Sequence, residues 1–239
     1  MIKIAIFSDV HGNLPALRSI IDDIKKENCD EIICLGDIVG IGPNPKECLD
    51  LIMDNSINLV LGNHELYYLL GTNIGNGMSE GEVKHQQWIK NKLGEKYKEF
   101  LKNCPLKIEK NYYNKKYLFQ HFIHLQNPIN NYPFEDLSIM KNNKINKIFS
   151  KMDYNYVFIG HEHKSFSLEI NGNKLIDIGS SGCVKNNITN YTILKVSEES
   201  TSIEQKNIVY DRNQLIKQLN KEDYPDRNFI SKIFFDLTI

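Results

Sequence analysis

Four short motifs in this sequence combine Asp, Asn and His, residue types that bind transition-metal ions. Each motif follows a short apolar run that predicts a buried strand, and one further histidine ends another such run. The candidate side chains, in chain order, are Asp9, His11, Asp37, Asn63, His64, His121, His161 and His163. Because ligands bind at the carboxyl ends of strands in open α/β sheets, these side chains can meet in one place. The pattern therefore predicts a metal centre.

The donor types indicate which metals this centre would take. Carboxylate oxygen, amide oxygen and imidazole nitrogen together suit Mn²⁺, Fe or Zn²⁺. Asp9 and His11 lie two residues apart, so both side chains can face the same way at a strand end. Asp37 has the two oxygens needed to bridge a metal pair, and a pair about 3.5–4 Å apart suits in-line phosphoryl displacement. We expect two divalent ions, with Mn²⁺ favoured and Fe, Zn²⁺ or Ni²⁺ as alternatives.

Length and composition limit the class of protein. The chain has 239 residues, of which 41% are hydrophobic and 25% are charged, as in ordinary globular proteins. Its net charge of −1 gives no general attraction to nucleic acid or to membranes, and no apolar stretch reaches transmembrane length. The first strand runs directly into the first motif, so no signal peptide is expected. Five scattered cysteines favour a reducing, cytoplasmic location.

Periodicity predicts the elements that would position the motifs. Residues 2–8, 31–35 and 57–61 are typical of buried strands, and helices are predicted over 13–26 and 46–53. Strands that alternate with helices in this way form a mainly parallel sheet. The first three motifs are therefore expected at the carboxyl ends of the strands of that sheet, on the same side.

A helical excursion is predicted after the third strand, at about 66–104. Residues 66–78 are rich in Gly and Asn and show weak periodicity. Ser79 and Glu82 have the spacing of a capping box, which predicts the start of a helix. We expect the excursion to lie over the sheet edge or the site, and its 66–102 portion to set substrate specificity.

Antiparallel strands dominate the predicted back half of the chain. Asn171 and Gly172 form a strong two-residue hairpin signal, and 191–196 and 203–210 indicate a second antiparallel pair. No linker or internal repeat is present. We therefore expect one domain over residues 1–239. Its strands would be parallel in the front half of the chain and antiparallel in the back half, and they would form two packed sheets with helices outside.

In this order, the motifs resemble those of the calcineurin-like metallophosphoesterases. That family's pattern is D-x-H, G-D, G-N-H-D/E, a single His and G-H-x-H, and all five parts occur here. The strings D-V-H-G-N-L-P-A-L at 9–17 and G-D-I-V-G-I-G-P-N-P at 36–45 are similar to the bacterial and archaeal small phosphodiesterase branch. The resemblance covers essentially the whole chain. It implies an α/β fold, a four-layer α/β/β/α sandwich of two mixed sheets with flanking helices.

The resemblance also implies a role for each candidate residue. The first metal would bind Asp9, His11, Asp37 and His163, and the second would bind Asp37, Asn63, His121 and His161. The catalytic residues would be Asp37, Asn63 and His64. His64 would protonate the leaving oxygen, and Glu65 would orient His64. His124 is an alternative to His121, but we expect His121 because it directly ends its strand.

Several other residues near the motifs have ordinary explanations. Cys183, near the expected site, could be reactive, but a small buried thiol is the better expectation. Tyr67, Tyr68 and Trp88 are expected to pack helices rather than to stack on a nucleobase, and His85 lies on a predicted helix. For Lys164, a contact with phosphate and an exposed position are both open.

These features together predict a metal-dependent phosphoesterase in which a metal-bridging hydroxide attacks phosphorus in line. A small phosphodiesterase or nucleotide phosphatase is expected, acting on a small phosphate ester. The alternatives are a dinucleoside polyphosphate hydrolase, a Ser/Thr-type protein phosphatase and, from a different class, a non-catalytic protein-binding scaffold. Retention of His64 argues against the scaffold. The natural substrate, the native metal and the choice between monomer and homodimer stay open.

Overall fold

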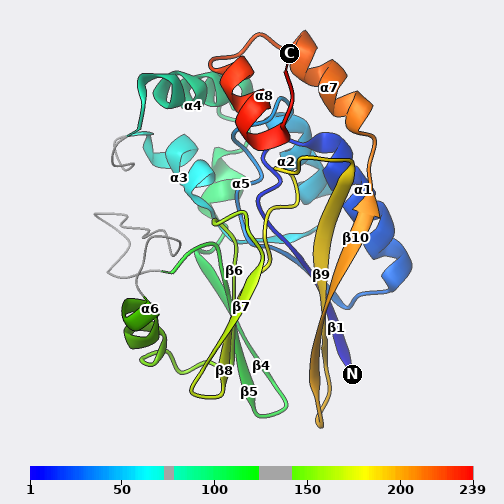
Figure 1. Cartoon of the computed structure of the whole chain (residues 1–239), viewed down its shortest axis with the longest axis vertical. Coiled ribbons are helices and arrows are strands. Elements are labelled where there is room, and N and C mark those ends of the chain that lie inside the picture. Colours follow the sequence, from blue (N-terminus) through cyan, green and yellow to red (C-terminus); the bar gives the residue numbers. More distant parts are fainter. Residues whose placement is uncertain (73–77, 124–141, 239) are drawn as a thin grey trace.

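Two mixed five-stranded sheets form the centre of the computed structural model, which describes residues 1–72, 78–123 and 142–238 (Figure 1). The strand orders are β10-β9-β1-β2-β3 and β4-β5-β6-β8-β7. The first sheet contains β1 (Ile2–Phe7), β2 (Glu31–Cys34), β3 (Asn58–Leu59), β9 (Ile188–Val196) and β10 (Thr201–Val209). The second sheet contains β4 (Lys107–Tyr112), β5 (Lys115–Gln120), β6 (Tyr156–Ile159), β7 (Phe166–Ile170) and β8 (Asn173–Asp177).

Helices flank the sheets, and Figure 1 shows α3, α4, α7 and α8 gathered at one end of them. The helices are α1 (Leu14–Glu27), α2 (Pro45–Asp54), α3 (Asn63–Leu70), α4 (Glu80–Leu93), α5 (Lys98–Lys102), α6 (Asn142–Phe149), α7 (Arg212–Lys221) and α8 (Arg227–Phe235). Among the residues described, no helix has both the length and the apolar character needed to cross a membrane.

Alternating side chains of β1 separate two hydrophobic cores. Ile4 and Ile6 pack between the sheets, against Phe119 and Phe158 of the second sheet and their neighbours. Ala5 and Phe7 point to the opposite face and join a core that includes apolar residues of α1 and α2. On the outer face of the second sheet, a further core includes residues of β5, β6, β8 and α6. The predicted α/β/β/α layering with two mixed sheets is thereby confirmed.

The predicted division into a parallel front half and an antiparallel back half is wrong. The hairpin of β9 and β10 joins the first sheet, where β9 pairs antiparallel with β1. In the second sheet, β5, β6 and β8 are parallel to one another. The reason is that β1 has a free edge that must be paired, and the long hairpin from the end of the chain covers it.

A helix that the sequence did not predict begins at the third motif. Helix α3 starts at Asn63, in a region interpreted as having weak periodicity. Its buried residues include Leu66, Tyr67 and Tyr68, which are consecutive and therefore lack the spacing of an amphipathic helix. By contrast, the capping box predicted at Ser79 is confirmed, with Ser79 Oγ accepting from the Glu82 amide at 3.2 Å.

Candidate metal centre

The structure brings the sequence-predicted site residues together at the carboxyl ends of parallel strands. Two strand ends of the first sheet and two of the second contribute residues, and the start of α3 contributes the rest. In chain order these are Asp9 and His11 after β1, Asp37 after β2, Asn63 and His64 at α3, His121 after β5, and His161 and His163 after β6. Backbone hydrogen bonds join these loops. For example, the His11 amide donates to the Asp37 carbonyl oxygen at 2.9 Å.

The backbone of the site is strained. Asp9, His11, Asp37, His161 and His163 all lie in the left-handed region, with φ between 47° and 76°. Such conformations cost about 1–3 kcal/mol each and cluster at functional sites. The left-handed conformation turns the chain sharply after each strand, so that side chains from different strands can converge.

One glycine of the motifs permits a close approach between the two sheets. A Cβ atom at Gly160 would lie 2.5 Å from Asp9 Oδ2 and 2.1 Å from Ser8 Oγ. A side chain at Gly160 would therefore push the loop after β6 away from the end of β1. This explains why glycine precedes the last His-x-His motif.

Backbone carbonyl groups set the tautomers of two histidines. His11 Nδ1 lies 3.2 Å from the Val39 carbonyl oxygen, and His121 Nδ1 lies 2.6 Å from the Leu35 carbonyl oxygen. Because a carbonyl oxygen can only accept, both rings donate from Nδ1. Their Nε2 atoms are then available as ligands, which is the usual arrangement of a metal-binding histidine.

Asp9, His11 and His163 form the first half of the centre. His11 Nε2 lies 2.9 Å from His163 Nε2. Asp9 Oδ1 lies 3.3 Å from His163 Nε2 and 3.7 Å from His11 Nε2. Two ring nitrogens this close repel each other unless a proton or a metal ion lies between them. The donor set of one carboxylate and two imidazoles fits a divalent ion.

Asn63, His121 and His161 form the second half, with Asp37 between the two halves. Asn63 Oδ1 lies 3.1 Å from His121 Nε2 and 3.0 Å from His161 Nδ1. Asp37 Oδ2 lies 3.3 Å from His121 Nε2 and 3.7 Å from His11 Nε2. Carboxylate, amide and imidazole donors also fit a divalent ion here.

Two buried carboxylates give the centre its negative charge. Asp9 and Asp37 are at most 2% exposed. Burial by itself would raise the pKa of each, but the adjacent histidines, His121 above all, hold both pKa values below the usual value. In return, Asp37 and Asp9 raise the pKa of His121 to about 9, against the effect of burial. The pair therefore stays ionised and requires compensating positive charge, which metal ions would provide.

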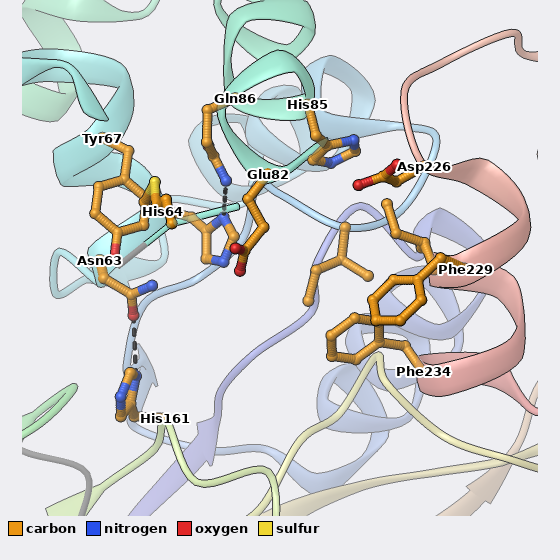
Figure 2. A pocket seen from close by; sticks show the side chains of 13 residues that line it. Asn63, His64, Tyr67, Glu82, His85, Gln86, His161, Asp226, Phe229 and Phe234 are labelled. Carbon is orange, nitrogen blue, oxygen red and sulfur yellow. Dashed lines mark hydrogen bonds between the residues drawn. The ribbon is translucent and has the colours of Figure 1, made fainter. Parts of the chain in front are cut away.

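His64 has a hydrogen-bond partner that was not predicted from the sequence. Gln86 of α4 places its Nε2 2.9 Å from His64 Nδ1 (Figure 2). Burial lowers the pKa of His64 to about 3, so the ring is neutral. An amide N–H can only donate, so Nδ1 accepts and the ring proton lies on Nε2.

Glu65 has a different role from the predicted one of orienting His64. Its buried carboxylate accepts four backbone N–H groups at 2.8–3.1 Å. The donors are Asp37, Ile38, Val39 and Gly62. Glu65 thus joins the loop after β2 to the start of α3, and so positions Asp37 against Asn63.

Cys183 reaches the centre, although a plain buried thiol was expected. Its sulfur and the ligand nitrogens of His11 and His163 all lie within 4.8 Å of one another. Burial raises the pKa of the thiol. None of the four motifs includes Cys183, which comes after β8 in the sequence, so this contact could not be predicted from the motifs.

The remaining predictions about neighbours have mixed outcomes. Trp88 packs against Tyr224, as a helix-packing residue should, with ring centroids 5.1 Å apart. His85 is buried and stacks on Trp88, with centroids 5.7 Å apart. Lys164 is exposed. His124 lies outside the described residues.

A cavity of about 340 Å³ opens beside His64 (Figure 2). Part of its wall comes from the predicted excursion, which therefore lies over the site. Another part comes from α8 and the residue before it, which sequence reasoning missed because no local signal relates the end of the chain to the motifs. The lining residues are Ile41, Asn63, His64, Tyr67, Met78, Glu82, His85, Gln86, His161, Asp226, Phe229, Ile230 and Phe234.

Comparison with known proteins places the chain in a family. The model of the calcineurin-like phosphoesterase superfamily domain matches residues 2–199. An uncharacterized protein of Methanocaldococcus jannaschii is 31% identical over 93% of this chain and 94% of its own. A symmetrical bis(5'-nucleosyl)-tetraphosphatase of Neisseria gonorrhoeae is 32% identical over 42% of this chain and 37% of its own. A crystal structure of a hypothetical protein from Pyrococcus horikoshii has the same fold, with a TM-score of 0.79, 17% identity and full coverage of both chains. The chain therefore belongs to the calcineurin-like phosphoesterase superfamily.

Proposed function

We propose that this protein hydrolyses small phosphodiesters or nucleotides with two divalent ions, Mn²⁺ being favoured. Asp37 carries the proposal, because its Oδ2 lies 3.7 Å from His11 Nε2 and 3.3 Å from His121 Nε2, between the two ligand groups. The first ion would be held by Asp9, His11, Asp37 and His163, and the second by Asp37, Asn63, His121 and His161. A single domain, a cytoplasmic location and the choice between monomer and homodimer stay predictions.

Two ions at such a centre would polarise the phosphate and supply a nucleophile near neutral pH. Asn63 is a neutral ligand and would hold an oxygen of the phosphate group without adding negative charge. His64 is neutral, with its proton on Nε2, and would donate that proton to the leaving oxygen. Gln86 would keep His64 in this tautomer. The named groups thus cover binding, charge stabilisation and protonation of the leaving group.

Hydrolysis of bis-p-nitrophenyl phosphate by metal-stripped protein tests the proposal. We expect no turnover without metal and restored turnover on addition of Mn²⁺. His64→Ala should lower turnover of an ester with an alkyl leaving group by about 100- to 10,000-fold. The loss should be smaller for the p-nitrophenyl ester, because p-nitrophenolate leaves without protonation.

Metal content, measured on the same samples, serves as the control for this experiment. His64→Ala should bind as many ions as the wild type, since His64 is not in either proposed ligand set. Protein that binds two ions and hydrolyses no phosphate ester would contradict the proposal. Equal rates for His64→Ala and the wild type on the alkyl ester would remove His64 from the mechanism.

Gln86→Ala should lower kcat by about tenfold and leave KM nearly unchanged, because it releases His64 without touching the phosphate site. Gln86→Glu should not restore the rate, because a carboxylate accepts from Nδ1 and moves the ring proton away from Nε2. Steady-state kinetics on an alkyl phosphate ester would measure both effects. Gln87→Ala, an exposed neighbour on the same helix, is the control. A Gln86→Ala enzyme with the wild-type kcat would show that this contact does not position His64.

Hydrolysis of dinucleoside polyphosphates is a second candidate function. It is favoured by the local similarity to bis(5'-nucleosyl)-tetraphosphatases, which covers less than half of this chain. The two candidates differ in the group that leaves from phosphorus: an alcohol in the first, and a phosphorylated nucleoside in the second. The cavity beside His64 bears directly on that difference.

A further inference from the structure

We propose that the cavity beside His64 binds the leaving alcohol of the substrate, and that this alcohol is a nucleoside without further phosphate groups. The inference rests on the proposed function and specifies its substrate class. In the reaction, water oxygen bonds to phosphorus, the P–O bond to the nucleoside breaks, and His64 Nε2–H protonates the departing oxygen. The proton that the attacking water releases then restores the neutral His64 ring.

The cavity is continuous with the candidate metal centre. Asn63, His64 and His161 belong to both. On the opposite side, the ring of Phe234 lies edge-on to that of His163, with centroids 6.0 Å apart. A group attached to a phosphate at the centre and departing past His64 therefore enters the cavity.

The size and the apolar wall of the cavity suit one aromatic group. A cavity of about 340 Å³ is at the small end of ligand pockets, so it would hold one nucleoside rather than two. Ile41, Tyr67, Phe229 and Phe234 supply apolar and aromatic surface. Phe229 is 60% exposed, although it is large and apolar, and Figure 2 shows it beside Phe234 on α8. An exposed aromatic ring at a cavity wall is suited to stacking on a planar base.

One oxygen among the residues that line the cavity is an acceptor without a donor. Gln86 Oε1 is buried and has no hydrogen-bond partner among the described residues. The carboxylates of Glu82 and Asp226 also line the cavity. A nucleobase presents N–H donors on a flat apolar ring, and so complements both features. A quaternary ammonium group would match the carboxylates but has no N–H for Gln86.

The charge of the cavity opposes a second phosphate. The described residues that line it include two carboxylates, Glu82 and Asp226, and no Lys or Arg. A phosphate attached to the leaving group would face these like charges, with no Lys or Arg among the described lining residues to compensate them. The leaving group should therefore be uncharged, which favours a nucleoside over a nucleoside polyphosphate.

Binding of adenosine to the Mn²⁺-loaded protein is the first test. Trp88 is the single tryptophan of the chain, and it stacks on His85 at the cavity wall, so its fluorescence should report occupancy. We expect adenosine to bind, and Phe229→Ser to weaken it by about fivefold or more. Ile233→Ser, an exposed residue of the same helix that does not line the cavity, is the matched control and should bind normally. No binding of adenosine, equal binding by Phe229→Ser, or binding of choline in preference to adenosine would overturn the proposal.

Substrate preference is the second test. AMP and adenylyl-(3'→5')-adenosine release adenosine, whereas ADP and bis(5'-adenosyl) tetraphosphate release a phosphorylated nucleoside. We expect higher kcat/KM for the first pair, and expect Glu82→Gln with Asp226→Asn to shift the ratio toward the second pair by about tenfold. Gln at 82 can keep the capping box, and Asn at 226 tolerates the left-handed backbone there (φ 60°).

The two tests separate this inference from the proposed function. If all four compounds remain intact with Mn²⁺ while adenosine still binds and Phe229→Ser weakens it, the proposed hydrolysis fails and the nucleoside site stands. If hydrolysis occurs but the second pair is preferred, or the double variant leaves the ratio unchanged, the inference fails and the phosphoesterase stands.

Discussion

Replacing Asp37 by asparagine is expected to lower phosphate-ester hydrolysis by at least about a hundredfold and to lower metal content. Asp37 Oδ2 lies 3.7 Å from His11 Nε2 and 3.3 Å from His121 Nε2, so one oxygen serves both halves of the centre. Asparagine removes the negative charge and the second carboxylate oxygen, and the amide cannot bridge two cations. Its Oδ1 can still accept from the His64 amide, a bond of 2.9 Å in the wild type, so the start of α3 should persist.

Metal stoichiometry and turnover on the same preparation measure this effect. We expect the wild type to bind two ions per chain and Asp37→Asn to bind one or none. Asp22→Asn, at an exposed position on α1, removes the same charge far from the centre and should change neither quantity. Two tightly bound ions and full turnover in Asp37→Asn would show that Asp37 does not bridge.

Replacing Glu65 by glutamine is expected to destabilise the fold by about 3 kcal/mol, which corresponds to a fall in Tm of about 6–12 °C. The carboxylate is fully buried and accepts four backbone N–H groups. Glutamine has the same shape but presents an NH₂ group in place of one oxygen. At least one N–H of the loop after β2 or of Gly62 then loses its acceptor in the interior.

Thermal and urea unfolding of metal-stripped protein would measure the loss without a contribution from ion binding. Glu80→Gln is the matched control, because its side chain is 90% exposed in the first turn of α4. A Tm within about 1 °C of the wild type in Glu65→Gln would show that this network contributes little to stability. Reduced activity at a temperature where the variant is folded would show, in addition, that the network positions Asp37.

Local signals in the sequence were sufficient for most of the elements. Asn13 caps α1 through the Ala16 amide, Asp211 caps α7, and the Ser79 capping box begins α4. The hairpin at Asn171 and Gly172 also forms. These signals succeed because a cap or a tight turn depends on residues within a few positions of one another.

Predictions that depended on contacts between distant parts of the chain were wrong. Whether β9 and β10 join the first or the second sheet depends on which edge is free, and no residue of the hairpin encodes that. Helix α3 was missed because its apolar residues are consecutive and its burial comes from the helices around it. The resemblance implied that Glu65 orients His64, whereas its bonds go to a loop 26–28 residues earlier and to Gly62.

The amino-acid sequence by itself determined the family, the α/β layering and the residues that converge at the centre, because each lies in a motif directly after an apolar strand. Only the tertiary structure decided what surrounds them. Gln86 meets His64 from another helix, Cys183 approaches His163 from beyond the second sheet, and Phe229 closes a cavity from the end of the chain. The physical reason is that strand ends are marked by local patterns, whereas the packing of helices over those ends depends on contacts between residues far apart in the chain.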